Sequence, residues 1–189
     1  MDADLKNKMD RNIWITRKCR INASERLLRT AKFIEFLNVY YSIFVIGLSI
    51  FSLESGEKWI SVASLISSIA LTISIIYANA TGLRERSASL KLNYISLQVL
   101  LDRLAFIKSD DEAGIQRIGA EYVELLKTTE NHLSIDMYRF KAEVADPQLQ
   151  LRGKEMIRWW AYLVWSFLWK AMVIILPIAG VGCVRLLMR

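Results

Sequence analysis

The strongest constraint on this chain is an uninterrupted apolar run, Trp59–Leu83, which contains no charged residue. A helix needs about 20 apolar residues to cross a hydrocarbon core of roughly 30 Å, so a run of this kind is typical of a transmembrane helix. Two further apolar runs flank it, Leu37–Leu53 and Trp159–Val184, and the first becomes long enough to span when it is extended back to Phe33. The three runs predict an all-α integral membrane protein.

The composition excludes most catalytic and metal-binding classes. One histidine and two cysteines are too few for a structural zinc site, a disulfide framework or an iron–sulfur cluster. Neither GxxxxGK[ST] nor GxGxxG occurs, so no phosphate-cradling loop is indicated. We expect no catalytic residue, no metal and no cofactor. A membrane enzyme is the weakest hypothesis, because Glu35 and Lys170 do not form a credible acid–base pair.

The charge distribution predicts the topology of the first two spans. Residues 1–32 carry nine lysines and arginines against four acidic residues, and Arg84, Arg86 and Lys91 follow the second span. Positive flanks favour the cytoplasm, so we expect a hairpin with both ends cytoplasmic and a short outer turn at Glu54–Lys58. The first span lies behind a long charged segment, unlike a cleaved signal peptide. Anionic membrane lipid explains the basic excess, and no direct nucleic-acid partner is expected.

The third apolar run allows two interpretations. Trp159, Trp160, Trp165 and Trp169 crowd its first half, as is typical near a membrane interface. Either it crosses the membrane and places the C-terminus outside, or it forms a re-entrant or monotopic helix. With the crossing interpretation, the expected parts are a cytoplasmic amphipathic N-terminal helix (1–32), a transmembrane hairpin (33–83), a cytoplasmic helical stalk or bundle (84–146) and a C-terminal segment with the third transmembrane helix (147–189).

The region after the hairpin shows two helical patterns. Leucines recur at seven-residue intervals, and a second heptad position is filled by mixed residues; the candidates for self-association are Leu83, Leu90, Tyr94, Leu97, Leu101 and Leu104. They predict either a coiled coil between copies or one stripe packed inside a local bundle. A capping box at Ser109–Glu112 predicts a further helix that ends near Asp146 and contains His132 as a solvated residue.

Polar side chains form one edge on each helix of the predicted hairpin. At 100° per residue, one stripe on the second helix contains Ser61, Ser64, Ser68, Thr72 and Asn79, and the edge on the first contains Glu35, Asn38, Ser42 and Ser49. Hydroxyl groups permit close helix packing and interhelical hydrogen bonds in lipid. Alternatively, several copies could turn these edges inward and line a pore.

Lys170 is the one charged residue of the third apolar run. Counted from Trp159 at 1.5 Å per residue, it lies about 16 Å deep, where a charge costs about 2.5–3.5 kcal/mol. Snorkelling to an interface is the simpler explanation. From this depth we favour a position facing a bundle interior or a pore, which adds Lys170 to the pore-lining candidates.

The order of these parts and several short motifs resemble the SLATT family, the two-transmembrane effector domains of bacterial conflict systems. The resemblance covers roughly residues 9–105 and rests on residues Trp14–Lys18, Arg20–Ala23, Tyr40–Ser42, Ser64–Ser74 and Glu85–Leu97. It implies a homo-oligomer that perforates the bacterial inner membrane during phage infection. It also implies a sensor partner such as a nucleotide-second-messenger synthase or a reverse transcriptase. The third span departs from the two-span pattern.

The leading hypothesis is therefore a self-assembling, pore-forming membrane effector. The alternative is a non-conducting membrane anchor or scaffold that recruits a cytosolic partner through Leu90–Leu104 or through the apolar face between Ile115 and Met137.

Overall fold

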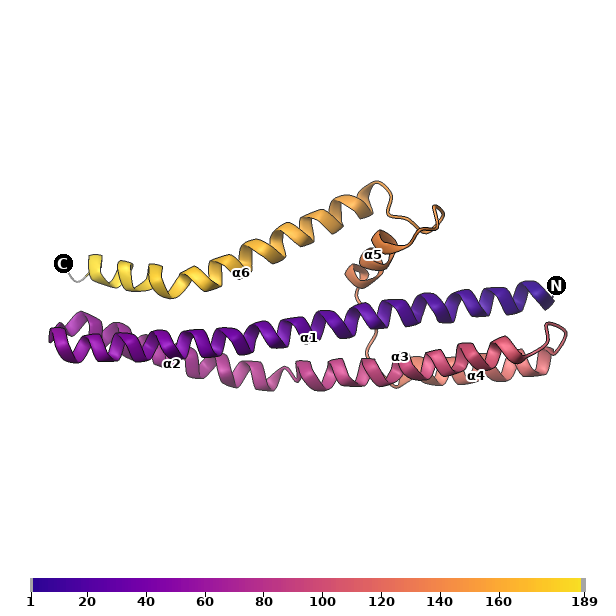
Figure 1. Ribbon diagram of the computed structural model, residues 1–189, viewed down its shortest axis with the longest axis horizontal. Coiled ribbons are helices and arrows are strands. Elements are labelled where there is room, and N and C mark those ends of the chain that lie inside the picture. The colour runs from indigo at the N-terminus through magenta and orange to yellow at the C-terminus, as the bar shows by residue number, and fades with distance from the viewer. Residues whose placement is uncertain (1, 188–189) are drawn as a thin grey trace. The chain divides into compact units, whose positions relative to one another are not determined.

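The computed structural model describes residues 2–187 as an all-helical chain without strands (Figure 1). The six helices are α1 (Asp2–Ser55), α2 (Lys58–Ala80), α3 (Leu83–Phe106), α4 (Glu112–Lys127), α5 (Ser134–Glu143) and α6 (Lys154–Leu187). Segments within α1, within α2–α3 and within α6 are long and apolar enough to cross a membrane. The predicted all-α membrane architecture is confirmed.

The helices divide into two compact units, each described here by itself. The first, called the polar bundle, contains residues 2–28 and 84–159; the second, called the apolar unit, contains residues 29–83 and 160–187. The N-terminal helix leads directly into the first apolar segment, since α1 has no break between Asp2 and Ser55.

The polar bundle is held together by one apolar core. Ile13 from α1 and Ile115 and Ile118 from α4 pack with four leucines of α3, and all seven are buried. Along α3 these leucines are Leu97, Leu100, Leu101 and Leu104. Burying each such side chain contributes about 1.5–3 kcal/mol to the free energy of folding, so this core holds α1, α3 and α4 together.

The helix expected to run from Ser109 to Asp146 is two helices. It begins after Asp111, whose carboxylate accepts a 2.9 Å hydrogen bond from the backbone N–H of Gly114, so Asp111 and not Ser109 is the N-cap. It ends at Lys127, and α5 starts only at Ser134. The intervening segment contains the β-branched Thr128 and Thr129, which propagate a helix poorly.

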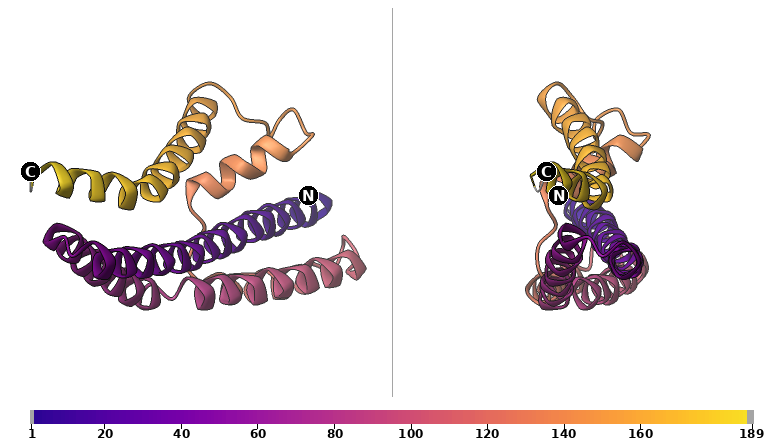
Figure 2. Two further views of the ribbon diagram at one scale, coloured as in Figure 1. Left: turned by 60° about the vertical axis from the view of Figure 1, so that its left-hand side comes forward. Right: turned by 90° about the vertical axis from the view of Figure 1, so that its left-hand side faces the viewer.

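In the apolar unit, a tight turn joins α1 to α2 as expected. Gly56 adopts φ of 64°, a left-handed conformation that favours glycine, and its N–H donates to the carbonyl of Ser52 at 3.2 Å. The α6 part of this unit runs parallel to α1, because Trp169 contacts Phe33 and the later residue Ile174 contacts Tyr40. Figure 2 shows that α6 bends along its length.

Candidate functional site: the apolar helices and their polar contacts

A side chain of α1 donates a hydrogen bond to α6 one turn before Pro177. Pro177 has no backbone N–H and cannot bond the carbonyl of Val173, four residues earlier. Tyr41 supplies the missing donor: its hydroxyl donates to the Val173 carbonyl at 2.6 Å. Because lipid offers no replacement partner, this contact satisfies a carbonyl that the proline leaves open.

The adjacent tyrosine strengthens the same contact. The hydroxyl of Tyr40 donates to the carbonyl of Ile174 at 3.1 Å. The Tyr41 side chain also borders an apolar cavity of about 170 Å³. Its other lining residues come from α2 and α6: Ala63, Ile66, Ser67, Ala70, Leu176, Pro177, Gly180 and Val181. Small residues let the three helices approach one another closely, as in membrane helix packing.

Lys170 lies near the start of the first apolar segment. Its Nζ is 5.4 Å from the ring centroid of Phe33, and the Trp169 and Phe33 rings meet edge to face at 5.5 Å. The expected depth of Lys170 assumed that the third span begins at Trp159. In the structure Lys170 instead stacks on Phe33, the residue with which the first span was expected to begin, and this cation–π contact stabilises the ammonium group.

The hydroxyl stripe on α2 divides into two parts with different partners. Near the turn, Ser64 pairs with Ser49 of α1 at 2.7 Å, and Ser61 pairs with Ser52 at 2.6 Å. These two contacts fit the packing interpretation, because they join the hairpin helices.

Farther along α2, the stripe is not used to join the hairpin. Ser68 donates to the carbonyl of Leu65 at 2.8 Å, and Thr72 donates to the carbonyl of Ser68 at 2.9 Å, both within α2 itself. Thr72 and Asn79 are exposed along this helix. This half of the stripe is therefore a polar surface on an otherwise apolar helix.

The candidates on α1 occupy successive turns. The hydroxyl of Ser42 donates to the carbonyl of Asn38 at 2.7 Å, and the hydroxyl of Ser49 donates to the carbonyl of Val45 at 2.9 Å. Asn38 is half-buried, whereas Glu35 and Ser49 are exposed. Their role in lining a pore stays a prediction.

Four of the heptad leucines are buried within the polar bundle of a single chain. Leu90, Leu97 and Leu104 are at most 1% exposed and Leu101 is 9% exposed, while Leu83 and Tyr94 are half-buried. This arrangement matches the local-bundle interpretation. Self-association through these residues stays a prediction, and it would require the polar bundle to open.

A buried arginine joins three helices of the polar bundle. Arg20 of α1 is 1% exposed, and its guanidinium donates to the side-chain oxygen of Asn93 in α3 and to the carbonyls of Leu125 (3.1 Å) and Leu126 (3.3 Å). Those carbonyls belong to the last turn of α4, where a cation is favourable. Asn93 also donates to the Leu125 carbonyl at 2.7 Å. Arg20 therefore fixes where α4 ends.

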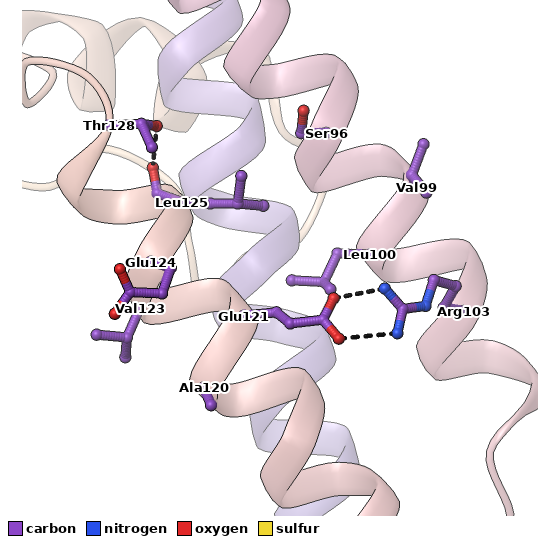
Figure 3. A pocket seen from close by; sticks show the side chains of 10 residues that line it. All are labelled: Ser96, Val99, Leu100, Arg103, Ala120, Glu121, Val123, Glu124, Leu125 and Thr128. Carbon is purple, nitrogen blue, oxygen red and sulfur yellow. Dashed lines mark hydrogen bonds and ion pairs between the residues drawn. The ribbon is translucent and has the colours of Figure 1, made fainter.

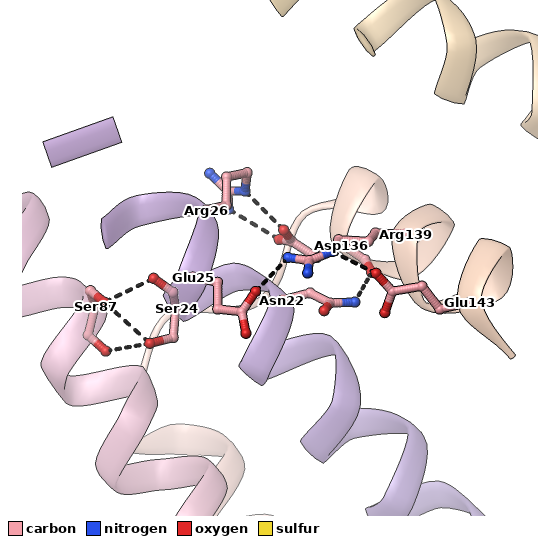
Figure 4. Close-up of polar contacts among 8 residues, drawn as sticks. All are labelled: Asn22, Ser24, Glu25, Arg26, Ser87, Asp136, Arg139 and Glu143. Carbon is pink, nitrogen blue, oxygen red and sulfur yellow. Dashed lines mark hydrogen bonds and ion pairs between the residues drawn. The ribbon is translucent and has the colours of Figure 1, made fainter. Parts of the chain in front are cut away.

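Helix α5 is held on α1 by charged and polar contacts (Figure 4). Asp136 is 2% exposed and accepts two hydrogen bonds from Arg26, at 2.8 and 3.0 Å. Asn22 donates to the backbone carbonyl of Asp136 at 3.0 Å, and Arg139 forms a 2.8 Å ion pair with Glu25. Paired, bidentate geometry makes a charged contact of this kind stronger than isolated surface ion pairs.

His132 does not lie on a solvated helix face, contrary to expectation. It is half-buried in the segment between α4 and α5, and within residues 2–187 its Nδ1 is a buried atom without a hydrogen-bond partner. Burial lowers the pKa of His132; the charge of Asp136 raises it and that of Arg20 lowers it. The expectation failed because the helix ends before this residue.

A groove of about 770 Å³ separates the outer faces of α3 and α4 (Figure 3). Val99 and Val123 line it and are 53% and 47% exposed. Arg103 and Glu121 form an ion pair across it, and the hydrogen bonds from Arg103 lower the pKa of Glu121. The groove is an apolar surface that the sequence patterns did not single out.

Three long apolar helices and a separate polar bundle define a helical membrane protein. Among the described residues, no group of three or more His, Cys, Asp or Glu side chains is placed to hold a metal ion. Residues 2–182 match the SMODS and SLOG-associating 2TM effector domain family 5, and the chain belongs to this family. It is therefore a membrane effector domain of conflict systems, as the resemblance to SLATT proteins predicted. No curated protein and no solved structure matches the chain significantly.

The extent of the match revises the expected range of the resemblance. It runs through α3, α4 and α5 and includes α6 as far as residue 182, well beyond residue 105. The third apolar helix therefore belongs to the region that the family shares, although the family name specifies two transmembrane segments.

Proposed function

We propose that this chain is an oligomeric pore-forming effector that permeabilises the bacterial inner membrane during anti-phage defence. Its N-terminus and residues 84–158 would then face the cytoplasm, with the C-terminus outside. Family membership supports the membrane effector class. The observation that carries pore formation is the second half of the α2 stripe, in which Thr72 and Asn79 are exposed on an apolar helix.

An exposed carboxamide in lipid has a large cost. The Asn79 side chain offers two N–H donors and a carbonyl acceptor, and in contact with acyl chains these groups would lose their hydrogen bonds to water. A ring of copies that turned Ser68, Thr72 and Asn79 toward a shared aqueous path would avoid this cost. Pore walls are built from polar side chains in this way.

Assembly and control are the remaining parts of the proposal. The chain acts as a homo-oligomer in membrane lipid, and a sensor protein controls it. The family name supports an association with SMODS or SLOG proteins. A nucleotide-second-messenger synthase or a reverse transcriptase is the expected kind of sensor.

The test is membrane potential in bacteria that express the full chain, read with a voltage-sensitive dye. We expect sustained depolarisation by the natural chain and its loss in a variant carrying Ser68→Leu, Thr72→Leu and Asn79→Leu. The matched control is Ser74→Leu, because Ser74 is also an exposed serine of α2 but lies on the opposite face. Equal depolarisation by both variants at equal membrane insertion would contradict the pore assignment.

A non-conducting scaffold is the second candidate, and the α3–α4 groove favours it. Val99 lines this groove and is 53% exposed, and Ile95 and Leu92, one and two turns earlier on the same side of α3, are 45% and 69% exposed, so a cytosolic partner could dock here. A scaffold would leave the membrane potential intact. Under this hypothesis, Val99→Glu would release a bound protein, whereas the triple leucine variant would not.

A further inference from the structure

Helix α6 is much longer than a membrane crossing requires. Its 34 residues extend about 51 Å at 1.5 Å per residue, whereas the hydrocarbon core is about 30 Å thick. A straight helix along the membrane normal would therefore place about 20 Å of its length outside the hydrocarbon.

The contacts with α1 identify which end is in excess. Trp169 and Lys170 lie against Phe33, and Lys32 immediately precedes Phe33 in the sequence. Because α6 runs parallel to α1 here, the residues after Lys170 enter the membrane alongside the first span. They extend about 27 Å as far as Leu187, which nearly covers one crossing. The excess is therefore the part of α6 before Trp169.

This excess segment carries an exposed apolar face. Five large side chains fall within about 100° of one another on the helix and are each at least 54% exposed: Ile157, Trp160, Val164, Phe167 and Leu168. Trp165, about 60° round the helix from Leu168, is 68% exposed as well. The remaining sides carry Arg158 and Ser166 together with three aromatic side chains, Tyr162, Trp165 and Trp169, of which Trp169 packs against Phe33. The segment is therefore apolar on most sides, and its tryptophan and tyrosine side chains distinguish it from the rest of α6.

A helix segment rich in tryptophan and tyrosine fits one environment better than others. At a membrane–water interface, the apolar face enters the acyl-chain boundary while indole N–H, phenol and guanidinium groups remain among headgroups. The segment is continuous with a membrane helix, which holds it next to the lipid. Helix α6 bends along its length, so its first and last parts need not share a direction (Figure 2).

We propose that residues 156–168 lie along the membrane–water interface, with Trp160, Val164 and Leu168 in contact with lipid, and that the crossing part of α6 begins at Lys170. The binding partner of this surface is the lipid interface itself. The proposal does not depend on whether the chain conducts ions.

Depth measurements on the full chain test this proposal. The residues Trp160, Val164 and Leu168 are replaced one at a time by cysteine in a Cys183→Ser background, and the remaining Cys19 is 0% exposed and unavailable to a label. Each variant receives a nitroxide label and is reconstituted into vesicles of phosphatidylethanolamine and phosphatidylglycerol. Accessibility to oxygen and to a water-soluble nickel complex then reports the depth of each label.

Two sets of labelled positions calibrate the measurement. Ile175 and Ile178, which are 58% and 61% exposed, mark the crossing part of α6, and Leu92, 69% exposed on α3, marks a position outside the membrane. Circular dichroism verifies that the labelled chains keep their helix content.

The expected result is one shallow depth for positions 160, 164 and 168, about 5–10 Å into the headgroup and acyl boundary, and a greater depth for positions 175 and 178. A depth that changes by about 12 Å between positions 160 and 168 would identify a straight crossing and overturn the proposal. Water accessibility equal to that at position 92 would also overturn it, because the apolar face would then not contact lipid.

Discussion

The hydroxyl of Tyr41 donates a 2.6 Å hydrogen bond to the backbone carbonyl of Val173, four residues before Pro177. A side chain of one apolar helix thus replaces the backbone donor that proline removes from another. The contact ties α6 to α1 at the position where α6 lacks a helical hydrogen bond of its own. It explains how a helix interrupted by proline remains stable in an apolar environment.

This relationship predicts that Tyr41 and Pro177 are energetically coupled. Tyr41→Phe should destabilise the protein by about 1–3 kcal/mol, because the Val173 carbonyl is left without a donor. Pro177→Ala restores a backbone N–H, so the same Tyr41→Phe change should then cost much less. Thermal unfolding of the four proteins in detergent, followed by circular dichroism, measures the coupling.

Tyr40→Phe is the control for this double-mutant cycle of Tyr41 and Pro177. The Tyr40 hydroxyl donates to the carbonyl of Ile174 at 3.1 Å, and the helical donor for that carbonyl is the N–H of Ile178, which proline does not remove. We expect no comparable coupling with Pro177→Ala. Additive effects of Tyr41→Phe and Pro177→Ala would show that the tyrosine does not substitute for the missing donor.

In the polar bundle, Arg20→Met should lower the free energy of unfolding by about 3 kcal/mol, since it leaves Asn93 and the last carbonyls of α4 without a charged donor. Arg103→Ala removes another arginine of the same bundle, but its side chain is 49% exposed, and the expected loss is below about 1 kcal/mol. Denaturant titrations in mild detergent compare the two. A loss for Arg20→Met no larger than that for Arg103→Ala would refute the role of Arg20.

His132 predicts a dependence of stability on pH. Its pKa in the folded protein is lowered, first by burial, so the unfolded chain binds more protons than the folded chain below about pH 6.5. Stability should therefore fall as the pH decreases from 6.5 through the folded pKa, and should become flat below it. Asp136 and Arg20 act on the same imidazole in opposite directions.

Unfolding midpoints measured between about pH 7.5 and 5 in the natural chain and in His132→Gln test this effect. The substitution should flatten the acid side of the profile, because glutamine does not titrate. An unchanged slope would assign the pH dependence to other groups.

Hydropathy was sufficient to predict the membrane helices and their hairpin. Trp59–Leu83 has no charge, and the flanking charges are asymmetric, so few alternatives to a membrane helix were available. The local structure of α4 and α5 was less predictable. Asp111 competed with Ser109 for the N-cap, and the interruption after Lys127 depends on partners far away in sequence, Arg20 and Asn93.

The candidate site was only partly predictable, because contacts between helices are not visible in the sequence pattern. The α2 stripe followed from helical periodicity, but periodicity does not indicate that Ser64 pairs with Ser49 while Thr72 bonds within its own helix. Lys170 was assigned a depth by counting from Trp159, and contacts such as that with Phe33, which the sequence does not reveal, show where α6 lies along α1. One signal was available and unused: Pro177 implies an open carbonyl at Val173.

Pore formation is tested most directly by ion flux through vesicles that contain only the purified chain. The account predicts that the natural chain and Ser74→Leu let ions enter the vesicles, which a trapped ion-sensitive dye reports. The variant with leucine at positions 68, 72 and 79 should show an ion flux at least tenfold slower at equal insertion. Equal flux with and without those three polar side chains would contradict their place in the conducting path. Vesicles that stay impermeable to ions although the natural chain is correctly inserted would contradict pore formation by the chain alone.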